Sequence, residues 1–317
     1  MTTYVPATKP TLYFIGVTTG QSSIMKVFPA WARELDLGDA AIKGIDFPLH
    51  ADPDAYRQAV EFIRDDPLSL GALVTTHKID LYAACHGLFD IIDDHALFMG
   101  ETSCLSKQGS KLVCHAKDPI SSGLALDAFL PPGYFANTDA ELFSMGAGGS
   151  TIALSWHLLR HQRGADMPAR VVISNRSQPR LDAIRRIHDG LRVTVPVEYV
   201  LAPKPEDNDR VMATLAPGSL VINATGLGKD APGSPLTDSG VFPERGIAWD
   251  LNYRGNLVFL DQARHQKESR KLRIENGWIY FIHGWTQVVA EVFHINIPTS
   301  GPRFDVLAEI ADRTARS

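Results

Sequence analysis

The stretch ELFSMGAGGST at residues 141–151 decides the fold. Its first half, Glu141 to Met145, is a short apolar run typical of a buried strand, and a helical pattern follows from about Thr151 to His161. A glycine-rich turn between strand and helix lets the backbone approach a pyrophosphate, and the helix N-terminus offers free N–H groups. The turn residues that we expect to bind a dinucleotide are Gly146, Ala147, Gly148, Gly149 and Ser150. Because Thr151 replaces the third glycine of the GxGxxG pattern, a glycine-rich turn without a ligand is the alternative interpretation.

Further strands are expected downstream of this turn. Apolar runs separated by helical patterns occur at Val171–Ser174, Val193–Val200, Leu220–Asn223 and Gly246–Leu251, the last of which closes the predicted series. Strands that alternate with helices of this length predict a doubly wound parallel sheet of the Rossmann type. Ligands of such sheets bind at the carboxyl ends of the strands, so the polar residues there are site candidates.

The residues after the second of these strands favour NADP over NAD. NAD sites commonly place a carboxylate there, whereas this chain has no carboxylate before Asp182. Guanidinium groups suit the extra phosphate of NADP because they make charge-assisted, often bidentate contacts. The candidates are Asn175, Arg176, Ser177 and Arg180. Two arginines that face solvent at a helix start are the alternative.

The first third of the chain predicts a second α/β domain. Strand-like runs at Leu12–Val17, Ile42–Phe47 and Leu70–Val74 alternate with helical patterns, one from Val27 to Leu35 and one at Asp54–Arg64. This order implies a mainly parallel sheet with helices on both faces, which makes a three-layer α/β domain. We therefore expect a substrate-binding domain at 1–125, an NADP-binding Rossmann domain at 126–275, and a helical C-terminal segment at 276–317 that packs back on the first domain.

Composition excludes several classes of function. A formal net charge of -5, with 31 dispersed Lys and Arg residues, argues against a nucleic-acid surface. The densest basic patch, Arg264–Arg273, is typical of a solvated helix end. The polar N-terminal segment Met1–Pro10 and the lack of an 18-residue apolar run argue against export or a membrane span. Three cysteines without a CxxC pair favour a reducing compartment, so we expect a cytoplasmic protein.

At this point the sequence resembles the shikimate dehydrogenase family. Three segments occur in that family's order and spacing: the GAGG loop at residues 146–149, the Asn-Arg-Ser segment at 175–177 and the Asn-Ala-Thr segment at 223–225. The family has threonine at the position of Ser177. The resemblance adds Asn223, Ala224 and Thr225 to the cofactor candidates. Tyr253, in a segment similar to the family's Asp-x-x-Tyr strand, and Gln287, in a late helical segment that ends near Phe293, are implied substrate-binding residues.

The resemblance extends more loosely into the first domain. It implies Lys78 as the catalytic lysine and Asp118 as its partner aspartate, and it matches Ser22 to the first serine of a substrate carboxylate clamp. The alternatives are that Lys78 caps a helix and that Asp118 starts a helix in an Asp-Pro pair. For Ser22 and Ser23, the alternative to substrate binding is that they cap a helix and do nothing else. Several family residues are replaced, the second clamp serine by Ile24, the clamp proline by Met25, the substrate asparagine of Gly-Ala-x-Asn-Thr by Ser103, and the asparagine of Asn-Thr-Asp by Ala116. Thr75 and Thr76 also differ from the family and could still bind a hydroxylated ring.

The resemblance implies an enzyme that interconverts a ring secondary alcohol and a ketone with NADP, shikimate or a relative being the substrate. In such a reaction Lys78 would protonate the developing alkoxide, and Asp118 would hold the lysine and a neighbouring hydroxyl. We expect the two to face the cofactor across an interdomain cleft, in a monomer or homodimer without a metal. A dehydrogenase for another polyol or cyclitol, and a nucleotide-binding metabolite sensor without turnover, are the alternatives. His157 and His161 have a metal-ligand spacing but favour a surface or packing role, whereas His283 is either a site residue or a packing residue.

Overall fold

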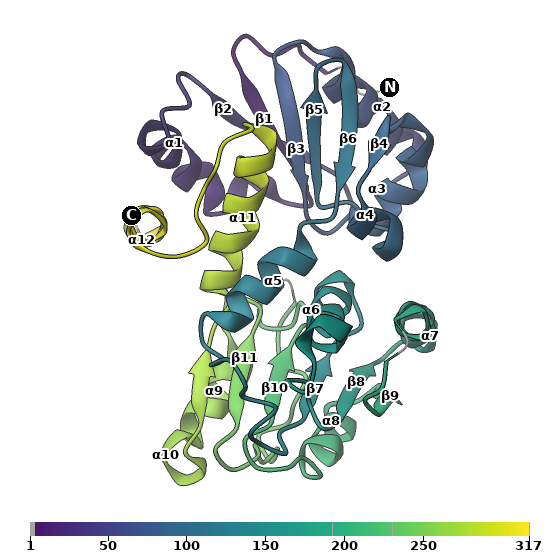
Figure 1. Cartoon of the computed structure of the whole chain (residues 1–317), viewed down its shortest axis with the longest axis vertical. Helices are drawn as coiled ribbons and strands as arrows, with labels where there is room; N and C mark the ends of the chain where they lie inside the picture. Colours follow the sequence, from purple (N-terminus) through teal and green to yellow (C-terminus); the bar gives the residue numbers. More distant parts are fainter. Residues whose placement is uncertain (1–3, 192, 230, 317) are drawn as a thin grey trace. The chain divides into compact units, whose positions relative to one another are not determined.

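The computed structural model describes residues 4–191, 193–229 and 231–316, so the first three residues of the polar N-terminal segment lie outside it. The chain divides into two compact units. Unit 1 comprises Met1–Asp118 and Ile282–Ser317, and unit 2 comprises Pro119–Phe281. Each unit contains one sheet with helices on its faces, which confirms the predicted pair of α/β domains, one of them a Rossmann domain (Figure 1). The boundaries 1–125, 126–275 and 276–317 stay predictions of functional domains.

The sheet of unit 1 has the strand order β2-β1-β3-β5-β6-β4. The strands β1 to β3 pair in parallel, β3 and β6 both pair antiparallel with β5, and β4 pairs parallel with β6. Hence β3 and β6 run in the same direction, and both end at the same edge of the sheet. The strands are β1 (Thr11–Gly16), β2 (Ala41–Asp46), β3 (Ser69–Val74), β4 (Ile91–Ile92), β5 (Cys104–Gln108) and β6 (Lys111–His115).

Apolar residues on both faces of this sheet explain its two helix layers. One face packs on α2 and α3 through a core that includes Tyr13, Ile15 and Val60. On the other face Phe14 contacts Trp285 of α11, with 5.0 Å between ring centroids. The indole of Trp31 on α1 donates a 2.8 Å hydrogen bond to the carbonyl of Leu307 on α12. The helices are α1 (Ile24–Glu34), α2 (Pro53–Asp65), α3 (Lys78–Cys85), α4 (Asp94–Met99), α11 (Trp278–Val292, which begins in unit 2) and α12 (Pro302–Arg316).

The sheet of unit 2 has the strand order β12-β11-β10-β7-β8-β9, and its neighbouring strands pair in parallel. In sequence order this is the 3-2-1-4-5-6 arrangement of a Rossmann fold, whose strand order reverses between β7 and β10. Ligands of such folds bind at that reversal, so the loops after β7 and β10 are the candidate positions. The strands are β7 (Leu142–Met145), β8 (Val171–Asn175), β9 (Val197–Leu201), β10 (Leu220–Asn223), β11 (Ile247–Asp250) and β12 (Arg273–Glu275).

Helices of unit 2 cover both faces of its sheet (Figure 1). Phe143, Val221 and Ala248 from three neighbouring strands share a buried apolar cluster with Met212 of α8 and Phe259 of α9. The helices are α5 (Asp118–Asp127, whose first residue belongs to unit 1), α6 (Gly149–Leu159), α7 (Gln178–Gly190), α8 (Pro205–Met212), α9 (Val258–His265) and α10 (Lys267–Arg270). In the described ranges, no helix has the length and apolar character that a membrane span needs.

Two expectations from the sequence were wrong. The strand at Gly246–Leu251 does not close the series, because β12 follows and pairs with β11. The basic patch Arg264–Arg273 is not one helix end: it contains the end of α9, the short α10 and the first residue of β12. There Arg273 donates a hydrogen bond to the carbonyl of Phe129, so this residue is structural.

The sequence also missed the antiparallel hairpin β5–β6 in unit 1. Polar residues fill its turn, where Gly109 adopts φ +63°. On the neighbouring strand β3, Gly71 has φ +147°, and a Cβ there would lie 2.1 Å from the carbonyl oxygen of Leu105 on β5. Glycine at this position therefore lets the hairpin pair closely with β3.

Candidate active site

Lys78 and Asp118 come together in unit 1 because β3 and β6 end at the same edge of the sheet. Lys78 is the first residue of α3, soon after β3, and Asp118 is the first residue of α5, soon after β6. The lysine Nζ donates to Oδ2 of the aspartate in an ion pair whose side chains are 18% and 10% exposed. An ion pair so withdrawn from water is screened much less than one on the surface, so it holds the ammonium in place.

The residue before the lysine fixes the start of α3. His77 is buried, and its Nδ1 lies 2.8 Å from the hydroxyl of Tyr56 on α2. Burial lowers the pKa of His77, so its imidazole is neutral at physiological pH. A neutral imidazole beside Lys78 adds no charge repulsion to the ammonium.

The segment before the aspartate is held by a network of polar contacts. The backbone N–H of Lys117 donates a 2.7 Å hydrogen bond to the hydroxyl oxygen of Ser103, and its Nζ lies 2.6 Å from Oε2 of Glu291 on α11. His115 lies between Asp93 and Glu291, at 3.3 Å and 3.4 Å. These contacts fix the backbone that carries Asp118.

Of the other predicted substrate residues, Ser103 contacts this segment directly through its hydrogen bond with Lys117, and Gln287 lies close to it. Gln287 lines a cavity of about 260 Å³ together with Lys117 and Glu291. Thr75 is half-buried, with its hydroxyl 3.2 Å from the carbonyl of Ile15, and Thr76 is exposed. Ser103 is buried.

Of the two serines of the carboxylate clamp that the resemblance implies, the chain keeps one, Ser22. Ser22 is half-buried just before α1, whereas Ile24 is fully buried and belongs to the core. Ser23 is the N-cap residue of α1, but its side chain makes no capping hydrogen bond. The capping interpretation of Ser23 is therefore wrong.

Tyr253 lies in unit 2, after β11. Its ring packs against Phe281 and Trp278, with ring centroids 4.7 Å and 5.2 Å away. These contacts give Tyr253 a packing role in unit 2, and the substrate role that the resemblance implies stays a prediction.

Glu101 is a buried acid beside the Lys78–Asp118 pair that the sequence reasoning missed. It is 1% exposed. Burial, and secondly the charge of Asp118, raise the pKa of Glu101 to about 7, while the Lys78 ammonium opposes this shift. The available signal was a carboxylate in a segment where the shikimate dehydrogenase family has alanine.

The glycine-rich loop of unit 2 has the geometry of a dinucleotide site. Gly146 follows β7 with φ +110°, and a Cβ there would lie 2.7 Å from the carbonyl oxygen of Ala224, which follows β10. Gly148 is the N-cap residue of α6 without a side-chain cap, and space is open around its Cβ position. The loop therefore lies at the reversal of strand order, with helix N–H groups that no side chain caps.

Thr151 replaces the third glycine of the motif without opening the loop. Its hydroxyl donates a 2.7 Å hydrogen bond to the carbonyl of Gly146 and lies 3.0 Å from the hydroxyl of Ser144 on β7. The threonine thus ties the helix start to the strand end, a task that close helix–strand packing performs in glycine-containing motifs.

The ends of β8 and β10 carry the remaining cofactor candidates. Asn175 accepts a 2.9 Å hydrogen bond from the N–H of Ser177, and the side chains of Arg176 and Arg180 are exposed. Asn223 accepts from both the N–H and the hydroxyl of Thr225. Two exposed guanidinium groups near the end of β8 fit the extra phosphate of NADP.

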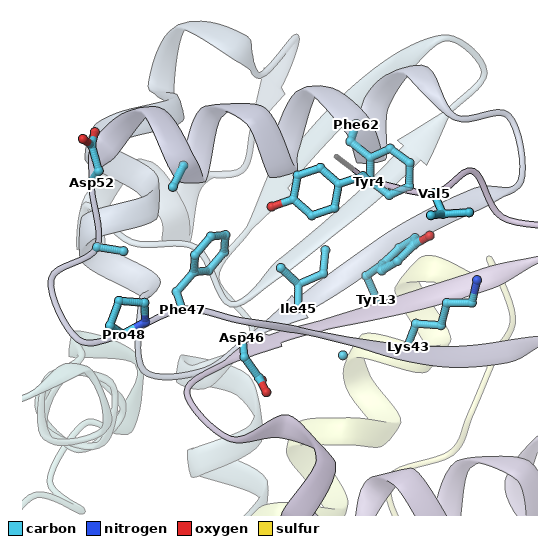
Figure 2. A pocket seen from close by; sticks show the side chains of 13 residues that line it. Tyr4, Val5, Tyr13, Lys43, Ile45, Asp46, Phe47, Pro48, Asp52 and Phe62 are labelled. Atoms are coloured by element: carbon cyan, nitrogen blue, oxygen red, sulfur yellow. The ribbon is translucent and has the colours of Figure 1, made fainter. Parts of the chain in front are cut away.

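A separate cavity of about 570 Å³ lies between β2 and α2 in unit 1. The rings of Tyr4, Phe47 and Phe62 line it, and Tyr4 stacks on Phe62 with 4.9 Å between centroids (Figure 2). Neither Lys78 nor Asp118 is among its lining residues. This cavity is therefore separate from the Lys78–Asp118 ion pair.

Two of the three histidines singled out by the sequence, His157 and His283, are buried, and the third, His161, is exposed. His157 is buried, and its Nε2 lies 3.0 Å from Nη1 of Arg163. His283 is 2% exposed and stacks on Phe304 of α12 with 4.6 Å between ring centroids. These contacts support a packing role for His283.

We expect His283 to make the protein sensitive to acid. Burial lowers its pKa from 6.5 to about 4, so its contribution to stability is full above pH 6.5 and is lost as the pH falls towards 4. The loss is up to about 3 kcal/mol of the free energy of unfolding, since each pKa unit corresponds to about 1.4 kcal/mol. A His283→Phe variant should show a flatter dependence of Tm on pH over this range. The exposed His161→Gln control should keep the dependence of the wild type, and an equally steep curve for His283→Phe would contradict this account.

One unit of the chain is a Rossmann unit with a glycine-rich loop, and the other carries a largely buried lysine–aspartate pair; a nicotinamide-dependent dehydrogenase needs both features. The chain is 28% identical over 235 residues to a shikimate dehydrogenase (NADP(+)) from Symbiobacterium thermophilum, which covers 73% of this chain and 72% of the relative. A shikimate dehydrogenase (NADP(+)) from Streptococcus pneumoniae is 26% identical over 180 residues, 56% of this chain and 58% of that protein. In sequence and in fold the chain is therefore similar to shikimate dehydrogenases.

Solved structures agree on the fold. Shikimate dehydrogenase from Aquifex aeolicus aligns with a TM-score of 0.72 at 17% identity, over 99% of this chain and 100% of that one. The Thermus thermophilus enzyme in complex with NADP(H) and shikimate aligns with a TM-score of 0.67 at 19% identity, over 96% and 99%. Quinate dehydrogenase from Corynebacterium glutamicum in complex with NAD gives 0.69 at 17%, over 95% and 98%. No family model matches the chain.

Proposed function

We propose that this chain interconverts a secondary alcohol and a ketone on a hydroxylated ring, either shikimate or a closely related compound. Because its relatives are shikimate dehydrogenases (NADP(+)), we infer that the chain is an NADP-dependent oxidoreductase of the shikimate dehydrogenase type. The proposal rests on the largely buried ion pair of Lys78 and Asp118. Such a pair can supply a proton to a carbonyl oxygen while the hydride comes from a nicotinamide.

In the proposed reaction Lys78 binds the carbonyl oxygen of the substrate. Its ammonium stabilises the negative charge that develops on this oxygen and then transfers a proton to it. Asp118 holds the lysine and accepts a hydrogen bond from a neighbouring ring hydroxyl. Other polar side chains are proposed to orient the ring: Ser22, Thr75, Thr76, Ser103, Tyr253 and Gln287.

NADPH, when bound, supplies the hydride. The glycine-rich loop fits its pyrophosphate, because helix N–H groups and open space at Gly148 would accommodate the phosphates. Arg176 and Arg180 are proposed to bind the extra phosphate, and Asn175, Ser177, Asn223, Ala224 and Thr225 to line the remaining contacts.

Replacing both arginines should change the cofactor preference. We expect the Arg176→Ala/Arg180→Ala variant to lower kcat/KM for NADP relative to NAD by about 100-fold, since a hydrogen bond to a charged group contributes about 1.5–3 kcal/mol. Arg186→Ala, an exposed arginine on the same helix, is the matched control and should keep the preference of the wild type. An unchanged ratio in the double variant would show that the arginines only face solvent.

The buried Ile24 favours a second candidate substrate class. Isoleucine has no hydroxyl, and Ile24 is fully buried in the core, so the clamp lacks its second hydroxyl. A substrate carboxylate bound there would be poorly paired. A polyol or cyclitol without a carboxylate avoids this cost. A metabolite sensor without turnover is a weaker alternative, because it gives the Lys78–Asp118 pair no task.

Initial rates with shikimate, quinate and a panel of cyclitols, each with NADP and with NAD, test the proposal. Turnover of shikimate with NADP supports the leading assignment, and turnover of a cyclitol alone would move the assignment to the second class. Tight NADP binding with no turnover of any compound would leave the sensor.

The cellular setting belongs to the same proposal. We propose a cytoplasmic enzyme without nucleic-acid or membrane partners, which acts as a monomer or homodimer. The three cysteines, Cys85, Cys104 and Cys114, are buried and free, as suits a reducing compartment.

A further inference from the structure

Glu101 adds a second carboxyl group beside the single ammonium of Lys78. It lies between Gly100, the C-cap residue of α4, and strand β5. The N–H of the next residue, Thr102, donates a 3.2 Å hydrogen bond to the carbonyl of Lys78, which ties this segment to the start of α3. The position of Glu101 relative to the lysine is therefore set by the backbone.

One carboxyl oxygen of Glu101 has no hydrogen-bond partner. Its Oε1 is buried, and none of the described residues donates to it. A buried and unpaired polar atom is costly, and such atoms in folded proteins often serve a functional role. The titratable groups that interact with Glu101 are Lys78 on α3, Asp118 on α5 and the buried Cys114 thiol on β6.

The burial and charges of these groups determine which of them is protonated near neutral pH. Burial raises the pKa of the Cys114 thiol to about 12, so this group is neutral. One ammonium can compensate one carboxylate, and Asp118 forms the ion pair with it. A second carboxylate at this place would be uncompensated. The pKa of Glu101 is therefore raised to about 7, and the group is mostly protonated below that pH.

We propose that Glu101 is a positioning residue that stores the proton with which Lys78 is recharged after each reduction. This role rests on the proposed function of Lys78. When the lysine has protonated the alkoxide, it is a neutral amine. The O–H bond of Glu101 then breaks and an N–H bond forms on Lys78, which restores the ammonium and leaves Glu101 as a carboxylate. A proton from water returns to Glu101 between turnovers, and alcohol oxidation runs the same transfers in reverse.

A Glu101→Gln variant tests this role, because glutamine keeps the size of the side chain and removes the transferable proton. In the wild type we expect kcat for ketone reduction to fall as the pH rises through about 7, the pKa of Glu101. The glutamine variant should lose this limb of the profile and be slower by about tenfold at pH 6, less than the 10²–10⁴-fold of a group that transfers a proton to the substrate itself, because Glu101 acts through Lys78. Glu101→Asp should keep the limb, and Glu61→Gln on α2 should match the wild type.

Thermal stability gives a second measurement that needs no turnover. The pKa of Glu101 is raised above its usual 4.5, so its contribution to stability is full below pH 4.5 and is lost as the pH rises through about 7. The difference in Tm between the glutamine variant and the wild type should therefore move in favour of the variant over this range. A constant difference would show that Glu101 holds no proton there.

The outcomes separate this role from the proposed function. If the wild type turns over no ring alcohol or ketone, the proposed function and the recharging role fail together. If turnover depends on Lys78 but the pH profile of Glu101→Gln equals that of the wild type, the role of Glu101 alone is overturned.

Discussion

A Lys78→Ala variant is expected to lose kcat by about 10²–10⁴-fold, which is the usual contribution of a positioned general acid. The reason is that alanine removes both the charge that stabilises the alkoxide and the proton that neutralises it. The loss should appear in kcat more than in KM, because the interaction strengthens as charge develops in the transition state. Initial rates at saturating substrate and NADPH measure it.

Two controls make the interpretation specific. Lys43→Ala removes an exposed lysine of the same unit and should leave kcat within about twofold of the wild type, as is usual for surface changes. Because the Lys78 ammonium is paired with Asp118, the alanine variant also leaves an unpaired carboxylate, so its Tm should be measured alongside. A folded Lys78→Ala enzyme with the kcat of the wild type would contradict the assignment of the lysine.

Gly148→Val should abolish cofactor binding without unfolding the protein. Apart from its chain neighbours, none of the described residues has an atom within 4 Å of the Cβ position at Gly148, so the fold leaves room there for a side chain. It would instead occupy the space in which the backbone approaches a pyrophosphate. We expect affinity for NADPH to fall by at least about 100-fold, because small displacements at such sites cost this much.

Fluorescence titration of NADPH measures this loss. Gly87→Val is the matched control, since Gly87 in unit 1 also has no atom within 4 Å of its Cβ position. It should bind NADPH as the wild type does. Undiminished binding by Gly148→Val, at an unchanged Tm, would show that the glycine-rich turn is not the cofactor site.

The sequence predicted the cofactor unit well because its signals are local. In a parallel sheet each strand is an apolar run of its own, so the series from β7 to β11 was visible in the sequence, although β9 begins at Val197 and not at Val193. The strand β12 was not predicted, because its three residues, Arg273–Glu275, are mostly polar. It forms at the sheet edge through pairing with β11, which no local pattern encodes.

Unit 1 was harder to predict because its active-site features depend on residues far apart in the chain. The hairpin β5–β6 is polar near its turn, and it becomes a pair of central strands only through Gly71 on β3. The burial of Glu101 likewise follows from that tertiary arrangement. From the sequence it was one carboxylate among 36 acidic residues, and its charge environment was not visible.

The departures from the family pattern had physical outcomes that the sequence left open. Thr151 was a missing glycine in the sequence, yet its hydroxyl bonds to Gly146 and preserves the loop. Ile24 was a missing clamp hydroxyl, and its full burial shows that the position belongs to the core of unit 1. Side-chain size and type indicated the change in each case, whereas the consequence depended on the neighbours.

The central claim is that this chain transfers hydride between NADPH and a ring ketone, and an isotope experiment tests it most directly. NADPH with deuterium at its transferable position would be incubated with the enzyme and the ketones derived from shikimate, quinate and the cyclitols. Our account predicts that deuterium appears on the carbinol carbon of one product, and that Lys78→Ala greatly slows this transfer. If NADPH binds but retains all its deuterium with every ketone, the chain is a sensor of nucleotide and metabolite, and the account is wrong.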